Sequence, residues 1–179
     1  MQRIPAAVRK KAQRIKLLLL DVDGVLTDGR IVMDHSGEEI KHFDVRDGHG
    51  IRLLLRAGIQ VGVISGRSSR ALKHRAKDLG IQLLYQNAYD KVDAYEKIKR
   101  KTGLKDRAIA YVGDDLVDLP LLRRVGLAIA VSDCWQDLKQ LSDYVTTAGG
   151  GRGAVREVAE LLLRSQRKWQ RVTQKYYLS

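Results

Sequence analysis

Four consecutive leucines at residues 17–20 run directly into Asp-Val-Asp-Gly at 21–24. A short apolar run that ends in turn residues is typical of a strand buried on both faces of a parallel sheet. Ligands of open α/β sheets bind beyond the carboxyl ends of the strands, so we expect Asp21 and Asp23 at the mouth of a crevice. Residues two apart in a strand point to the same side, and two adjacent carboxylates repel each other unless something offsets their charge. The segment therefore indicates a divalent cation site, with an ordinary loop contact as the alternative.

The size and composition of the chain restrict its class. Its 179 residues, 44% hydrophobic and 30% charged, suit one globular domain with a proper core. No apolar run approaches the roughly 20 residues that a membrane span needs, and the basic N-terminus lacks the apolar region of a secretory signal. The single cysteine, Cys134, cannot form an internal disulfide, which fits a reducing compartment. We therefore expect a cytoplasmic protein without membrane contact.

The formal net charge of +12 is unusually high. Nucleic-acid binding is one interpretation of such a balance, but the basic residues are spread along the chain and aromatic residues make up only 6%. Two denser basic clusters, within 9–16 and 164–171, lie near the two ends, where solvated helix faces are the usual explanation. A field that gathers small anionic substrates is the interpretation that we favour over a nucleic-acid partner.

Strand-like and helix-like segments alternate along the chain. This alternation predicts one α/β domain over 1–179, a doubly wound, Rossmann-like fold with a mostly parallel sheet. The expected strands are 17–20, 59–64, 81–85, 108–112, 127–131 and 144–145. The expected helices are 48–57, 68–79, 91–101, 115–125, 135–141 and 157–171, and the last carries an apolar stripe at Val158, Leu161 and Leu162.

A β-hairpin is predicted within 30–43, directly after the first strand, because two partly alternating runs flank a glycine-containing turn at 34–37. A two-stranded hairpin alone is marginally stable in water. It must therefore pack either on its own domain or on a neighbouring subunit.

Three further polar features follow predicted strands. Ser65 and Gly66 open the turn after the second strand, where a hydroxyl, backbone N–H groups and a helix N-terminus suit a phosphate, although many such turns read Ser-Gly for geometry alone. Lys91 opens the helix after the third strand, and most lysines at such positions are simply solvated.

Carboxylates cluster after the fourth strand. Asp114 and Asp115 follow Gly113, and Asp118 lies one helical turn further on. Such oxygens are suitable ligands for a hard cation. The alternative is that Asp114 or Asp115 caps the next helix.

Taken together, Asp-x-Asp, Ser, Lys and Gly-Asp-Asp, each at the carboxyl end of a strand, resemble the haloacid dehalogenase superfamily of phosphotransferases. The resemblance implies that Asp21 is the nucleophile, that Asp23 is the general acid and base, and that Ser65 and Lys91 hold the phosphoryl oxygens. It also implies Mg²⁺ bound by Asp21, the Asp23 backbone carbonyl and Asp114. Asp115 is a weaker candidate for a water-mediated contact to the metal.

The spacing of these motifs leaves no room for a large cap domain. The interval 21–65 holds only a hairpin and a helix, and 65–114 holds only ordinary strand–helix units. The chain therefore resembles the cap-less members of the superfamily, whose open sites need water exclusion and substrate selection from elsewhere, most simply from another subunit.

Longer segments are similar to one family within this superfamily, the 3-deoxy-D-manno-octulosonate 8-phosphate (KDO 8-phosphate) phosphatases of lipopolysaccharide sugar synthesis. They include GEEIKHFDVRDGHGI at 37–51 and AGGGRGAVREV at 148–158. The resemblance implies a homotetramer in which the hairpin and the tail, 149–179, contact neighbouring active sites. The glycine-rich start of the tail, 149–153, is expected to reach an active site, with a flexible linker as the alternative.

The implied substrate carries a carboxylate, which arginine recognises bidentately. Arg46, Arg67 and Arg152 are our candidates, with Gly66 beside them, and Arg67 is the strongest. His49 departs from the family pattern, where an aromatic such as Tyr is expected, and the C-terminal helix is unusually basic. Two alternatives stay open: a phosphatase of another sugar acid, such as a nine-carbon 9-phosphate, and a non-catalytic basic binding module.

Overall fold

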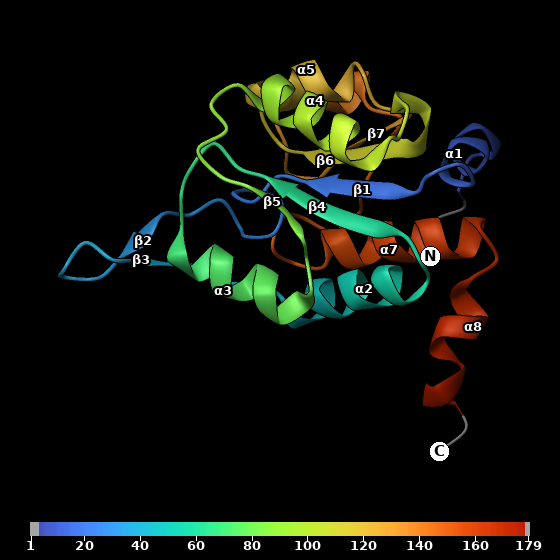
Figure 1. The fold of residues 1–179 in the computed structure, drawn as a ribbon, viewed down its shortest axis with the longest axis horizontal. Helices are drawn as coiled ribbons and strands as arrows, with labels where there is room; N and C mark the ends of the chain where they lie inside the picture. Colours follow the sequence, from blue (N-terminus) through green and yellow to red (C-terminus); the bar gives the residue numbers. More distant parts are fainter. Residues whose placement is uncertain (1–3, 178–179) are drawn as a thin grey trace.

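Six strands form the central sheet of the computed structural model, which describes residues 4–177 (Figure 1). Their order is β5-β4-β1-β6-β7-β8, and every neighbouring pair is parallel. The predicted doubly wound parallel sheet is therefore confirmed. The strands are β1 (Leu17–Leu20), β4 (Gln60–Ile64), β5 (Leu83–Tyr85), β6 (Ile109–Gly113), β7 (Leu127–Ala130) and β8 (Tyr144–Val145).

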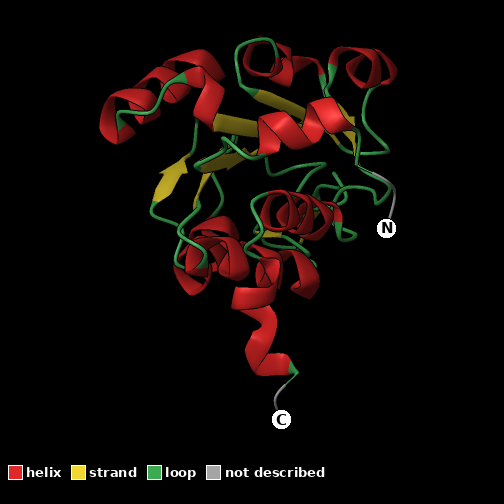
Figure 2. Ribbon diagram, turned by 90° about the vertical axis from the view of Figure 1, so that its right-hand side faces the viewer, coloured by secondary structure: helices red, strands yellow, loops and turns green. Residues whose placement is uncertain are grey.

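Helices cover both faces of this sheet. In Figure 1, α4 and α5 lie above the sheet, and α2, α3 and α7 lie below it; Figure 2 shows the same layers from the side. None of the helices within residues 4–177 is long and apolar enough to cross a membrane. The helices are α1 (Ala6–Ala12), α2 (Val45–Arg56), α3 (Arg70–Leu79), α4 (Lys91–Thr102), α5 (Leu119–Leu122), α6 (Gln136–Leu141), α7 (Ala154–Ser165) and α8 (Trp169–Thr173), with short 3₁₀ turns at Asp106–Ala108, Leu116–Asp118 and Gln174–Tyr176.

The strand of four leucines is the centre of the fold. β1 lies between β4 and β6, and all four of its side chains are completely buried. The order in which strands are added to the sheet reverses at this strand, because β4 and β5 lie on one side of it and β6, β7 and β8 on the other. Ligand crevices of open sheets form at such a switch point.

The predicted hairpin follows β1. Strands β2 (Val32–Met33) and β3 (Glu39–Ile40) pair antiparallel, and the Asp34 carboxylate accepts hydrogen bonds from the N–H groups of Ser36 and Glu38 to hold the turn. In Figure 1 the hairpin projects from the end of the sheet where the parallel strands end. Between β1 and α2 the chain forms only this hairpin and its connecting loops.

Helices α2 and α7 pack closely under the sheet. A Cβ atom on Gly50 of α2 would lie 3.1 Å from Ala159 of α7, so a larger residue would push the helices apart. Asp47 of α2 accepts hydrogen bonds from the N–H groups of Gly153 (3.3 Å) and Arg156 (2.7 Å). Asp47 therefore caps α7, whose own N-cap residue is Gly153. Burial raises the pKa of the Asp47 carboxyl to about 6.

The final helix differs from its prediction. The prediction of a single helix over 157–171 was wrong. Helix α7 already begins at Ala154 and ends at Ser165, and a separate helix, α8, follows. Arg167 closes α7 with a left-handed backbone (φ 55°), and the Lys168 N–H bonds back to the Leu163 carbonyl. Glycine usually occupies the left-handed position that follows a helix. Because arginine stands there in this chain, the residue types give no sign that the helix ends. The predicted helix at 115–125 is also shorter, since a 3₁₀ turn precedes α5.

Candidate active site

A cleft of about 350 Å³ opens at the carboxyl ends of the central strands. The structure brings most of the predicted site residues together in its walls, although they come from widely separated parts of the chain. The predicted residues that line it are Asp21, Asp23, Ser65, Gly66, Arg67, Lys91, Asp114 and Asp115.

Lys91 holds two buried carboxylates. Its ammonium lies 2.8 Å from Asp21 and 2.6 Å from Asp118, and all three side chains are nearly inaccessible to solvent. Burial lowers the pKa of a lysine, but here the charges of Asp118 and Asp21 outweigh it and raise the pKa of Lys91. The lysine therefore stays charged. The alternative that Lys91 is an ordinary solvated residue is wrong.

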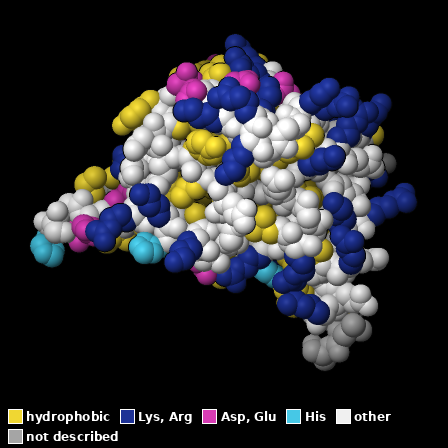
Figure 3. All heavy atoms as spheres, viewed as in Figure 1, with side chains coloured by type: hydrophobic (Ala, Val, Ile, Leu, Met, Phe, Trp, Pro, Cys, Tyr) yellow, Lys and Arg dark blue, Asp and Glu magenta, His cyan; other side chains and the backbone are white. Residues whose placement is uncertain are grey.

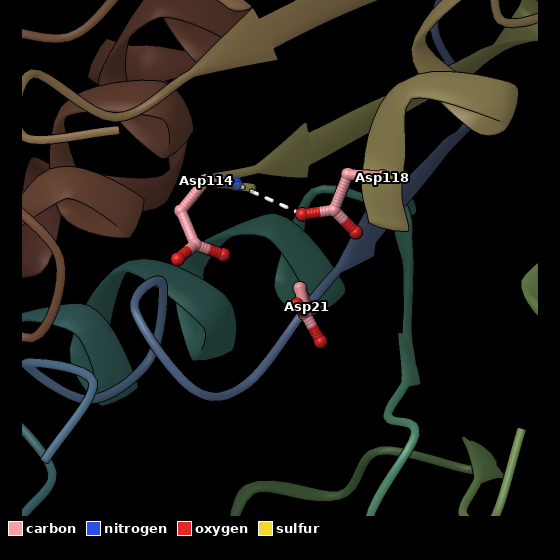
Figure 4. Close-up of side chains that lie close together, drawn as sticks. All are labelled: Asp21, Asp114 and Asp118. Carbon is pink, nitrogen blue, oxygen red and sulfur yellow. Dashed lines mark hydrogen bonds between the residues drawn. The ribbon is translucent and has the colours of Figure 1, made fainter. Parts of the chain in front are cut away.

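Asp21, Asp114 and Asp118 converge on one point, as Figure 4 shows. One oxygen of each lies within 4.8 Å of the others. Asp118 is engaged by the protein itself: one oxygen accepts from Lys91 and Tyr111, and the other from the Asp114 N–H (2.9 Å). Asp21 and Asp114 are therefore the carboxylates best able to hold a cation, and oxygen donors of this kind fit Mg²⁺.

Asp21 and Asp114 have raised pKa values, so these two carboxyl groups are protonated more readily than usual. Burial, and then the charge of Asp118, raise the pKa of Asp21 to about 6. Burial raises the pKa of Asp114 to about 8, with further contributions from Asp118 and Asp21. A bound cation would favour the ionised form of both groups, which is the physical reason to expect a metal here.

Asp115 has a different position from Asp114. Its carboxylate caps the 3₁₀ turn by accepting a hydrogen bond from the Leu116 N–H (2.8 Å). The capping alternative therefore applies to Asp115. The Asp114 carboxylate instead packs against the loop after β1, where a Cβ atom on Gly24 would lie 2.0 Å from it. Gly24 is needed both for this approach and for its positive φ of 83°.

The hairpin contributes a lysine that the sequence analysis missed. Lys41 lies 2.5 Å from Asp23 and 3.1 Å from Glu39, and its side chain is 2% exposed. Arg67 adds a second cation, 2.8 Å from Glu39 and 3.6 Å from Asp23. The available signal was the spacing of Glu39 and Lys41, since residues two apart in a strand share a face.

The turn after β4 has the form expected of an anion site. Ser65 is 3% exposed, and its hydroxyl oxygen accepts a hydrogen bond from the Arg67 N–H (3.2 Å). A Cβ atom on Gly66 would meet nothing within 4 Å, so open space adjoins this backbone. Helix α3 begins just beyond, capped by Ser69. The three features together leave room for a phosphoryl group beside Asp21 and Lys91.

Two of the three candidate arginines lie outside the cleft walls. Arg46 pairs with Asp44 (2.6 Å) and donates to the Arg152 carbonyl (3.0 Å). The Arg152 side chain is exposed. Only Arg67 lines the cleft. Roles for Arg46 and Arg152 in substrate binding stay predictions.

The glycine-rich segment 149–153 packs on the loop that follows β1 in the same chain. A Cβ atom on Gly150 would lie 1.8 Å from the Gly24 carbonyl oxygen, and the Gly151 N–H donates to Val25 (2.9 Å). The Asp133 carboxylate accepts from the Gly150 N–H (2.9 Å). The segment is therefore fixed against the active-site loop, and the flexible-linker alternative is wrong.

Comparisons with known proteins agree with this geometry. Residues 36–126 match the model of the haloacid dehalogenase-like hydrolases. The chain is 48% identical over 165 residues to 3-deoxy-D-manno-octulosonate 8-phosphate phosphatase KdsC of Escherichia coli K12, covering 92% of this chain and 88% of that one.

Solved structures give the same result. The phosphatase of this name from Yersinia pestis superposes with a TM-score of 0.90 at 47% identity, over 91% of this chain and 88% of the other. The one from Moraxella catarrhalis, in complex with a magnesium ion, a phosphate ion and KDO, gives a TM-score of 0.92 at 41% identity, over 94% and 97% of the two chains.

This chain belongs to the haloacid dehalogenase-like hydrolases. The predicted superfamily is confirmed, and the protein is a phosphoric monoester hydrolase. Within that class, the curated and solved relatives described above carry the name KDO 8-phosphate phosphatase.

Proposed function

We propose that this enzyme hydrolyses KDO 8-phosphate to KDO and phosphate through an aspartyl-phosphate on Asp21. The single observation that carries the chemistry is the ion pair of Asp21 with Lys91 (2.8 Å) in a cleft that also contains Asp23 and Ser65. The substrate is proposed from the shared name of the relatives and from the KDO and phosphate bound to the Moraxella protein.

In the first step an Asp21 oxygen attacks phosphorus, and the bond between phosphorus and the sugar oxygen breaks. The ammonium of Lys91, 2.8 Å away, favours the ionised form of Asp21, which can then act as the nucleophile. Asp23 gives its proton to the departing alcohol oxygen. The Lys91 ammonium and the Ser65 hydroxyl stabilise the negative charge of the transferring group.

In the second step water hydrolyses the aspartyl-phosphate. Asp23, now ionised, takes a proton from the attacking water, the bond between Asp21 and phosphorus breaks, and phosphate leaves. The position of Asp23 suits both steps, because it lies two residues after Asp21 and lines the same cleft.

Mg²⁺ is the proposed cofactor, held by the carboxylates of Asp21 and Asp114 and by the Asp23 backbone carbonyl. When bound, it supplies positive charge that offsets the carboxylates and polarises the phosphoryl oxygens. The convergence of Asp21 and Asp114 and the magnesium ion bound to the Moraxella relative support this choice.

Arg67 is our leading candidate for the substrate carboxylate, because it lines the cleft with 42% of its side chain exposed. Arg46 and Arg152 could bind the substrate carboxylate only in an assembly that brings them to the active-site cleft of a neighbouring subunit. We propose a homotetramer for that reason. The outward apolar residues of the hairpin, with Met33 58% and Ile40 45% exposed, support a subunit contact there.

The reaction belongs, in this proposal, to the synthesis of the sugar acid of lipopolysaccharide. A cytoplasmic location follows the same proposal and agrees with a single buried, unpaired cysteine, Cys134.

A substrate panel tests this function. Phosphate release is measured with KDO 8-phosphate, a nine-carbon sugar-acid 9-phosphate and glucose 6-phosphate, each with Mg²⁺ and with a chelator. We expect strong, metal-dependent preference for KDO 8-phosphate. Preference for the 9-phosphate would keep the mechanism but reject the substrate, and release from none of the three would reject both.

A further inference from the structure

A second concave region lies at the opposite end of the sheet from the active site. A hollow of about 540 Å³ is formed by residues 13–16, 58–59 and 165–168, where β1 and β4 begin. None of these residues lines the active-site cleft. A neighbouring hollow of about 600 Å³ shares Arg14 and Lys16 with it and adds Lys105 and Arg107.

Four cations line the first hollow without any acidic residue among its walls: Arg14, Lys16, Arg167 and Lys168. Elsewhere many basic residues are neutralised, as Arg52 is by Asp78 and Lys97 by Asp93. None of the four has a carboxylate partner within residues 4–177. Cations that share one hollow and have no carboxylate among its walls attract an anion.

The walls of this hollow are held by the fold. The Gln166 amide crosses from the end of α7 to donate to the carbonyls of Ala12 (3.0 Å) and Ile15 (2.8 Å). The Lys16 N–H bonds to the Ala108 carbonyl (2.8 Å), and its carbonyl accepts from Gln60 (2.9 Å). The left-handed backbone of Arg167 costs about 1 kcal/mol for a residue other than glycine and turns the chain beside the hollow.

A buried hydroxyl in the same walls lacks a partner. Ser165 is 6% exposed, and its Oγ atom makes no hydrogen bond to any residue that the structure describes. Ser165 lines the hollow with the four cations. A buried hydroxyl without a partner is unfavourable, and a side-chain rotation toward the hollow would let a ligand oxygen accept its hydrogen bond.

We propose that this hollow binds a small anion that carries more than one phosphate group. Several separate cations match several phosphates better than a single carboxylate, and arginine and lysine together are common phosphate ligands. Because no aromatic side chain lines the hollow, recognition rests on the phosphates rather than on a stacked base. Figure 3 shows Lys and Arg side chains gathered on the side of the molecule away from the hairpin, where β1 begins in the same view in Figure 1. The site is independent of the proposed reaction.

Calorimetry with inorganic tripolyphosphate and metal-free protein tests the proposal. Tripolyphosphate can also enter the active-site cleft, which contains Lys91 and Arg67, so the variants decide between the two sites. Binding that does not weaken when Arg14 and Arg167 are replaced would overturn the proposal. The double variant Arg14→Gln, Arg167→Gln should lose affinity by about tenfold or more. The matched control Lys73→Gln, Lys77→Gln removes the same charge from exposed positions on α3 and should bind as the parent protein does.

A second arm uses ATP in place of tripolyphosphate. Similar affinities for the two ligands, and the same dependence on Arg14 and Arg167, would support recognition of the phosphates alone. Binding that requires the adenosine would overturn that assignment. Absence of binding would overturn the site itself. An equal loss of affinity in both double variants would also overturn it, because binding would then depend only on the net charge of the protein.

Discussion

The ammonium of Lys41 lies 2.5 Å from the carboxylate of Asp23, so the hairpin reaches back to the strand end from which it departs. Lys41 also pairs with Glu39, and Arg67 completes the group from the turn after β4. The proposed acid and base of the reaction is therefore positioned partly by the hairpin.

Replacing Lys41 with Met tests this relationship. The variant keeps the apolar stem but leaves Asp23 and Glu39 with only Arg67 as a nearby cation. We expect kcat for phosphate release to fall by about a hundredfold, the lower end of what general acid–base catalysis contributes. Lys97→Met, which breaks an exposed pair with Asp93, is the control and should leave kcat unchanged. An unchanged rate in Lys41→Met would show that Asp23 needs no such partner.

Asp118 is predicted to be essential to the arrangement of the cleft, although it is completely buried. Asp118→Asn removes the charge that faces Lys91 and disturbs the contacts to Tyr111 and the Asp114 N–H. Breaking a buried ion pair costs about 3 kcal/mol or more in the free energy of unfolding. Urea denaturation measures it. Asp93→Asn, in a half-exposed pair, should cost about 0.5 kcal/mol or less, and equal losses in the two variants would contradict this account.

Gly150→Ala tests the contact between the glycine-rich segment and the active-site loop. The added Cβ atom would lie 1.8 Å from the Gly24 carbonyl, so backbone must move. We expect a loss of about 2 kcal/mol in stability and a lower kcat. Gly66→Ala, where the Cβ meets open space, is a control for stability only. Equal thermal midpoints for Gly150→Ala and the parent protein would refute the close contact.

The stabilisation by Mg²⁺ should increase with pH. The folded pKa values of Asp21 (about 6) and Asp114 (about 8) lie above the ordinary 3.8. In the metal-free protein these groups stabilise the fold in their protonated form. That stabilisation is fully present below pH 3.8, and it is lost as pH rises through about 6 for Asp21 and about 8 for Asp114. A cation binds the ionised carboxylates, so its effect grows over the same window.

Thermal unfolding with and without Mg²⁺ from pH 5 to pH 9 measures this effect. Each proton displaced by the metal changes the stabilisation by at most about 1.4 kcal/mol per pH unit. Asp114→Asn should remove most of the dependence above pH 6. A stabilisation by Mg²⁺ that is constant from pH 5 to pH 9 would contradict metal binding by these two carboxylates.

The sequence predicted the parts of the site that depend on position along a strand. Asp21, Ser65, Lys91 and Asp114 each follow a buried strand, and parallel strands bring their carboxyl ends together whatever the loops do. The same reasoning predicted a mostly parallel sheet but not the order of its strands, because the pairing of strands depends on packing between distant segments.

Other features depend on contacts between distant residues. Lys41 and Asp23 meet only once the hairpin has folded back, and Asp47 caps a helix that begins more than a hundred residues later. The break after Ser165 was missed because Arg167 occupies a backbone conformation that usually signals glycine, while Trp169 and Val172 continue the apolar pattern. Local pattern carries no information on such contacts.

Asp21 is the proposed nucleophile of a KDO 8-phosphate phosphatase. The most direct measurement compares kcat for KDO 8-phosphate, with Mg²⁺, in the parent protein and in Asp21→Asn, with circular dichroism to confirm that both are folded. We predict metal-dependent turnover in the parent and a loss of at least about a thousandfold in the folded variant. A folded Asp21→Asn enzyme that keeps most of its activity, or a parent protein that releases no phosphate from this ester, would contradict the claim.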